Sequence, residues 1–161
     1  MRDGITPCVL LFAAFGLALA FAPRSAWLPS LGALLSTLAA PSIVSSGRGW
    51  LDAAFLGCWI SVIIIAGTVQ LFRKLPSWAA LLLSIDAGAW ASAVTSLTGS
   101  RLQVLAVSPC VLIVWPAVCV TRRYGPIPIR VASSWLIAIA ALSGFLQFLP
   151  VTPGYLPDHL E

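Results

Sequence analysis

The chain has 161 residues, of which 60% are hydrophobic and only 9% are charged. Soluble domains carry about 25% charged residues, so this composition excludes an ordinary soluble protein and predicts an integral membrane protein. The net charge of +4 comes from cations that stand singly or in pairs between apolar runs. This distribution argues against a nucleic-acid-binding patch and indicates topology signals instead.

Six apolar stretches approach the roughly 20 residues that a helix needs to cross a bilayer. Because the connections between them are only a few residues long, consecutive helices should lie antiparallel. We therefore expect an all-α fold, a polytopic bundle of about six transmembrane helices with short loops that forms one membrane domain over residues 1–161. The expected spans are residues 5–22, 26–45, 50–72, 77–98, 102–120 and 128–149.

The basic residues predict how such a bundle sits in the membrane. Cytoplasmic loops are enriched in Lys and Arg, so the side with more cations should be the cytoplasmic one. Both termini then lie outside the cytoplasm, and we expect a bacterial inner membrane. With six spans, one side holds Arg24, Arg73, Lys74, Arg122, Arg123 and Arg130, and the other holds Arg2, Arg48 and Arg101.

Two segments of the chain resemble each other. "LPSLGALL" at residues 28–35 and "LPSWAALL" at residues 75–82 agree at six of eight positions. Both follow a basic loop, which suggests repeated helical hairpins over residues 26–72 and 77–120. Leu and Ala are so common in this chain that chance similarity stays an open alternative.

Prolines interrupt two of the expected spans. Pro41 lies in the second span, and Pro109 and Pro116 lie in the fifth. These spans correspond if the chain consists of two three-helix halves, and broken helices at matching places indicate the binding sites of transporters. Prolines also occur in membrane helices for structural reasons alone, so both interpretations remain. In either case we expect the fifth span to depart from a regular helix.

Asp86 is the most informative single residue. It lies 12 residues after Lys74 and 15 before Arg101, near the centre of the fourth span, where an ionised carboxylate costs about 2.5–3.5 kcal/mol. The acid could be protonated, could face a wet cavity or ion path, or could bond to a neighbouring helix or subunit. Trp90 and several alanines share its helix face, and small residues favour close helix packing, so Asp86 should face protein rather than lipid.

Two further polar residues extend this candidate pathway along the third span. Asp52 follows Arg48 by four residues at the outer end, where an ion pair or the helix dipole would explain it. Its functional interpretation is the mouth of a path to Asp86. Gln70, near the inner end, would extend that path or would form hydrogen bonds at the membrane interface.

Other chemistry finds little support in the sequence. The four cysteines lie in apolar runs without C-x-x-C spacing, which favours buried free thiols over a disulfide or metal site. The single histidine, His159, excludes a His-based metal centre or catalytic triad. Asp52 and Asp86 should lie about 12–15 Å apart along the helices, too far for an aspartyl protease. We expect no enzyme activity, no cofactor and no metal.

Two functions remain. The first is a small multi-pass transport protein or permease subunit with a midplane site near Asp86, completed by homo-oligomerisation because six short helices enclose little space. The alternative is a non-catalytic membrane subunit or scaffold, in which Asp86 bonds to another member of a larger complex. Both readings place the chain in a lipid bilayer, and neither involves nucleic acid.

Overall fold

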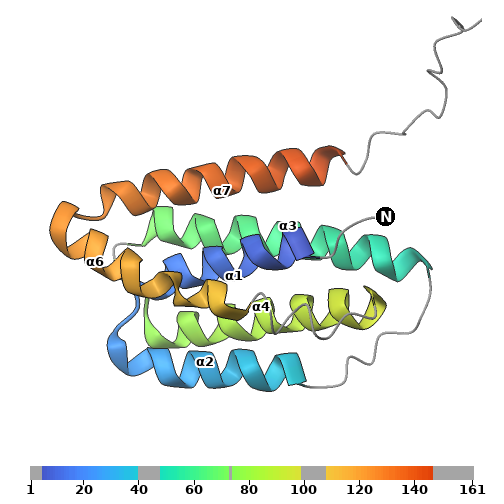
Figure 1. Cartoon of the computed structure of the whole chain (residues 1–161), viewed down its shortest axis with the longest axis horizontal. Coiled ribbons are helices and arrows are strands. Elements are labelled where there is room, and N and C mark those ends of the chain that lie inside the picture. Colours follow the sequence, from blue (N-terminus) through green and yellow to red (C-terminus); the bar gives the residue numbers. More distant parts are fainter. Residues whose placement is uncertain (1–4, 40–47, 73, 99–107, 147–161) are drawn as a thin grey trace, which may run out of the picture.

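The computed structural model of the chain describes residues 5–39, 48–72, 74–98 and 108–146. Over these residues the fold is all-α, as predicted, and Figure 1 shows the helices side by side in one bundle. The elements are α1 (Ile5–Leu19), α2 (Arg24–Ala39), α3 (Arg48–Leu71), α4 (Ser77–Thr98), the 3₁₀-helix η1 (Ser108–Ile113), α6 (Val114–Tyr124) and α7 (Ile127–Leu146).

Three of the described helices are long and apolar enough to cross a membrane. They provide the candidate spans Asp52–Leu71, Ser77–Ser96 and Ile127–Leu146, and these spans indicate an integral membrane protein. The prediction of about six full spans is therefore wrong for the described residues. The helices α1 and α2 have 15 and 16 residues, and at 1.5 Å per residue they reach only about 22–24 Å, less than a hydrocarbon core of about 30 Å.

The expected fifth span, residues 102–120, is not one continuous helix. Its described part begins with the six residues of η1 and continues as α6, which has 11 residues. Pro109 lies in η1, and Pro116 is the third residue of α6. A proline in the first turn of a helix removes an N–H that has no intrahelical partner, so Pro116 is compatible with the start of α6. Pro41, the other proline of this group, lies outside the described residues.

Helix α1 forms the centre of the bundle. It packs against α3, α4, η1, α6 and α7, and its side chains Leu11, Phe12, Phe15 and Leu19 are at most 1% exposed. The segment from Ile5 to Leu19 contains no charged residue, and a helix that is hydrophobic on all sides is stable only when it is surrounded by protein or lipid.

Helices α2 and α7 form the two outer layers, with α2 against α4 and α7 against α3. Chain neighbours are therefore not always the main packing partners, because α2 packs chiefly on α4 rather than on α1. Close approach of α2 and α4 depends on Gly88, where an added Cβ would lie 3.1 Å from the Leu34 carbonyl oxygen and would overlap Thr37. Only 17% of the α7 span is buried, against 56% for the α3 and α4 spans.

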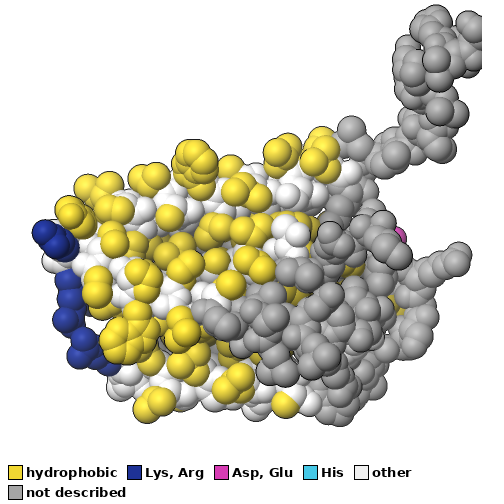
Figure 2. Space-filling model, viewed as in Figure 1, with side chains coloured by type: hydrophobic (Ala, Val, Ile, Leu, Met, Phe, Trp, Pro, Cys, Tyr) yellow, Lys and Arg dark blue, Asp and Glu magenta, His cyan; other side chains and the backbone are white. Residues whose placement is uncertain are grey.

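Figure 2 shows a group of basic side chains at one end of the bundle and apolar side chains over its flank. The connections from α1 to α2, from α3 to α4 and from α6 to α7 all lie at this cationic end (Figure 1). The backbone N–H of Leu75 donates to the carbonyl of Phe21 at 3.0 Å, so two of these connections are bonded together. The cations near these connections are Arg24, Lys74, Arg122, Arg123 and Arg130.

Candidate functional site

Asp86 is held at the contact between α4 and α3. It is the tenth residue of the 22-residue α4, it is half-buried, and its Oδ2 accepts a hydrogen bond from the hydroxyl of Ser61 on α3. Ser61 is itself only 1% exposed. The carboxylate is therefore bonded to a neighbouring helix, one of the three explanations that the sequence leaves open for its position.

Trp90 lies one turn beyond Asp86 and contacts the same helix. Its indole ring occupies the position that a Cβ on Gly57 would take, so the missing side chain of Gly57 makes room for the ring. Gly57 and Ser61 are four residues apart on α3, as are Asp86 and Trp90 on α4. Gly57 meets Trp90 and Ser61 meets Asp86, so residue numbers rise along α3 while they fall along α4, as in antiparallel helices.

Two buried cysteines lie in the core of the bundle. Cys8 from α1 and Cys58 from α3 are 2% and 0% exposed, and their side chains are in hydrogen-bonding contact. Cys58 also lies close enough to Asp86 for a direct electrostatic interaction. We refer to Cys58, Ser61 and Asp86 as the interior polar cluster.

Sequence reasoning treated the cysteines as separate buried thiols and missed this cluster. Cys58 and Ser61 are three residues apart and so share one face of α3, a spacing that could have signalled a polar patch opposite Asp86. No comparable signal exists for Cys8, because its contact depends on how α1 packs against α3.

The remaining pathway candidates lie away from the interior polar cluster. Asp52 is exposed and nine residues from Ser61, about 13 Å along the axis of α3. Gln70 lies nine residues from Ser61 in the other direction, and its side-chain amide donates to the Arg130 carbonyl at 2.6 Å and to the Ser133 hydroxyl at 2.8 Å. Gln70 thus bonds α3 to α7, while Asp86 bonds α3 to α4.

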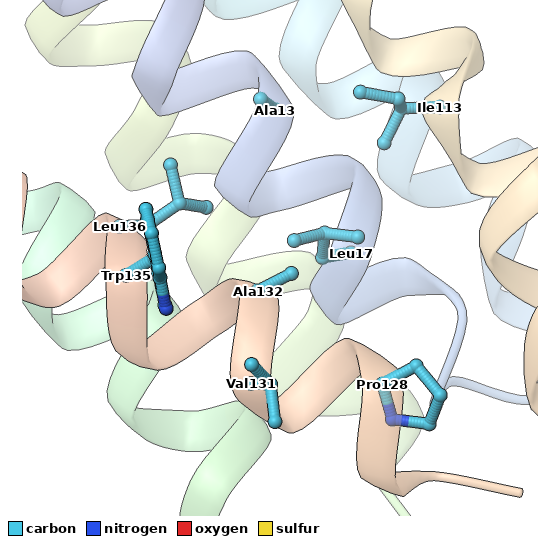
Figure 3. Close-up of a pocket in the computed structure, with 8 residues that line it drawn as sticks. All are labelled: Ala13, Leu17, Ile113, Pro128, Val131, Ala132, Trp135 and Leu136. Atoms are coloured by element: carbon cyan, nitrogen blue, oxygen red, sulfur yellow. The ribbon is translucent and has the colours of Figure 1, made fainter.

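A groove of about 480 Å³ opens on the flank of the bundle between α1, η1 and α7 (Figure 3). We refer to it as the lateral groove. It is bounded by apolar groups, so it suits hydrocarbon rather than a polar solute, and no member of the interior polar cluster lines it. Its lining residues are Ala13, Leu17, Ile113, Pro128, Val131, Ala132, Trp135 and Leu136.

Over the part of the chain that the structure describes, no group of three or more His, Cys, Asp or Glu side chains could hold a metal ion. The interior polar cluster offers the exchangeable protons of a hydroxyl and a thiol near a carboxyl group. No protein-family model matches the chain, and neither the curated proteins nor the solved structures gave a match.

Proposed function

We propose that the protein is a small multi-pass membrane transport protein or permease subunit in which Asp86 binds and releases a proton. The observation that carries the proposal is a half-buried carboxylate near the middle of a candidate span, bonded inside the bundle to Ser61. Ionisable side chains at this depth are costly, and where they occur they commonly serve ion and proton pathways.

The chemistry around Asp86 suits a proton better than a metal cation. The Ser61 hydroxyl can both donate and accept a hydrogen bond, so it can serve Asp86 as a carboxylate and as a carboxylic acid. The Cys58 thiol nearby carries another exchangeable proton. Hard cations such as Ca²⁺ and Mg²⁺ need about six or more oxygen ligands, whereas the interior polar cluster supplies one carboxyl group and one hydroxyl.

The test is proton flux through the purified full chain in liposomes, followed with a pH-sensitive dye trapped inside. The wild-type protein should carry protons down a pH gradient, and Asp86→Asn should lower this flux at least about tenfold, because the amide cannot take up the proton. Asp52→Asn is the matched control, since Asp52 is exposed and outside the interior polar cluster, and it should retain the flux.

Circular dichroism checks that both variants keep their helices. Absent flux in the wild-type protein, or equal flux in the wild-type protein and Asp86→Asn, would contradict the proposal.

A second function, a non-catalytic membrane subunit or scaffold, is supported by α7. The α7 span is mostly unburied, and it presents Trp135, Leu142 and Phe145 at 62–69% exposure. A helix of another subunit, or of a second copy, could pack on this face. In that case the wild-type protein carries no protons alone, and replacing Trp135 and Leu142 by Ala lowers the oligomeric state measured by light scattering in detergent.

The arrangement of charges supports a specific orientation. The basic side chains that Figure 2 colours lie at one end of the bundle, whereas Arg48 begins α3 at the other end. Short loops rich in Lys and Arg stay in the cytoplasm. We therefore propose a bacterial inner membrane, with the cationic end in the cytoplasm and both chain termini on the opposite side.

A further inference from the structure

The lateral groove and the cationic end of the bundle lie next to each other, and neither has a role in the proposed proton site. Pro128 lines the groove and is the second residue of α7, so the groove begins beside the connection from α6 to α7. We propose that the groove and this connection together bind one anionic phospholipid from the leaflet at the cationic end. One acyl chain occupies the groove, and the headgroup phosphate binds to Arg122 and Arg123.

The length and the lining of the groove suit an acyl chain. Its lining residues on α7 run from Pro128 to Leu136 (Figure 3), and the eight residue steps between them correspond to about 12 Å of helix. One leaflet contributes about half of a hydrocarbon core of about 30 Å, so the groove extends from the cationic end through most of one leaflet. Trp135 on the groove is 69% exposed, so the groove is open to lipid from the side.

Arg122 and Arg123 lie where the headgroup of such a lipid would be. Both are in the last turn of α6 and are exposed, and α6 packs against α1 and α7, the two helices that form the sides of the groove. The Arg123 Cζ lies 5.7 Å from the centre of the Tyr124 ring, and tyrosine favours the membrane interface. Because a guanidinium binds phosphate through two parallel N–H donors, this arginine pair suits a phosphate headgroup.

Charge favours an anionic lipid over a neutral one. Among the described residues, Asp52 and Asp86 are the only acidic ones. Asp86 lies midway along α4, and Asp52 is the fifth residue of α3, at the end of the bundle opposite the cationic end. The described part of the chain therefore supplies no carboxylate that offsets the cations at this end. Basic side chains at a membrane surface attract anionic lipids, and basic pockets beside membrane helices bind their headgroups.

The experiment measures lipid binding to the full chain in detergent by native mass spectrometry. Phosphatidylglycerol is the anionic probe, and phosphatidylcholine with the same acyl chains is the neutral probe. We expect phosphatidylglycerol to bind at least about fivefold more tightly, the effect of one basic side chain near a membrane surface. Arg122→Gln with Arg123→Gln should remove this preference and leave the binding of phosphatidylcholine unchanged. The matched control, Arg24→Gln with Lys74→Gln, removes two cations from other connections at the same end and should keep the preference.

A second pair of variants tests the place of the acyl chain. Ala132→Phe fills the groove and should weaken the binding of both lipids, whereas Ser134→Phe adds a ring to an exposed position of α7 outside the groove and should leave binding unchanged. Phosphatidylglycerol with brominated acyl chains, bound at one lipid per chain, should quench the fluorescence of Trp135. That signal is the difference between each protein and its Trp135→Phe counterpart, and Ala132→Phe should abolish the quenching.

Several outcomes would overturn the lipid site. Equal affinities of the wild-type protein for the two lipids, or an equal loss of preference in the two double arginine and lysine variants, would show that Arg122 and Arg123 do not bind the headgroup. Unchanged lipid binding or unchanged quenching in folded Ala132→Phe would show that the acyl chain lies elsewhere. A wild-type dimer in light scattering that Ala132→Phe converts to a monomer would show that a second copy occupies the groove.

Discussion

The indole of Trp90 fills the space that a Cβ on Gly57 would require. Helices α3 and α4 therefore pack closely because the large side chain of Trp90 on α4 lies against Gly57 on α3, which has no side chain. Gly57→Ala should destabilise the protein by about 1–3 kcal/mol, the usual cost of overpacking, measured by thermal unfolding in detergent.

Gly67→Ala on the same helix is the matched control for this substitution. A Cβ at Gly67 meets nothing within 4 Å, and Ala is the better helix former by up to about 1 kcal/mol, so stability should hold or rise. Trp90→Ala, combined with Gly57→Ala, should cost less than the two single changes added together. Equal losses at Gly57 and Gly67 would contradict the packing described here.

Gln70 should contribute to stability because it bonds α3 to α7 through its side-chain amide. Gln70→Leu keeps most of the volume and removes both hydrogen bonds, so we expect a loss of about 1 kcal/mol and faster hydrogen exchange in α7. Thr68→Val is the control, since the Thr68 hydroxyl bonds only within α3, to the Ile65 carbonyl. A comparable loss and faster exchange in the control would show that the bonds to α7 are not the cause.

Ser30 and Ser84 are both 0% exposed but differ in hydrogen bonding. The Ser84 hydroxyl donates to the Leu81 carbonyl at 2.6 Å, whereas that of Ser30 has no partner among the described residues. A buried unpaired polar group costs about 1–3 kcal/mol, so Ser30→Ala should raise the melting temperature and Ser84→Ala should leave it equal or lower. A lower melting temperature for Ser30→Ala would reveal a hydrogen bond made by that hydroxyl.

Reporter fusions can test the proposed orientation. A fusion after Lys74, in the connection between α3 and α4, and one after Gly125, between α6 and α7, should both report the cytoplasm, because both follow basic residues at the cationic end. A fusion at the C-terminus should report the opposite side. Opposite results for the two internal fusions would contradict the arrangement of α3, α4, α6 and α7 in Figure 1.

Composition and the lengths of the apolar stretches predict an all-α membrane protein, but they do not predict the number of spans correctly. Hydropathy measures how apolar a stretch is. It does not predict where a helix begins or ends, or whether part of it is a 3₁₀-helix rather than an α-helix. Residues 102–120 are apolar, yet Ser108–Ile113 forms a 3₁₀-helix. The two similar octapeptides also differ locally, because Pro29 lies inside α2 whereas Pro76 precedes the start of α4. The duplication therefore stays a hypothesis.

The candidate site was partly accessible to sequence reasoning. The small residues on the face of Asp86 indicated that it faces protein, and the bond to Ser61 agrees with that inference. The contact between Cys8 and Cys58 could not be predicted, because 50 residues separate them and only the packing of α1 against α3 brings them together. Asp52, Asp86 and Gln70, the polar members of the predicted pathway, lie at separate depths along α3 and α4.

The central position of α1 has a consequence for biogenesis. This helix precedes all its packing partners in the chain, and α7, one of them, follows every other described helix. During synthesis, α1 is therefore made before the helices against which it packs in the finished bundle. The segment from Ile5 to Leu19 carries no charge, so it can remain in the lipid until then. The lipid acyl chains are about as apolar as the side chains of a protein interior. Assembly of the bundle then amounts to replacing lipid around α1, helix by helix, as the later segments leave the ribosome.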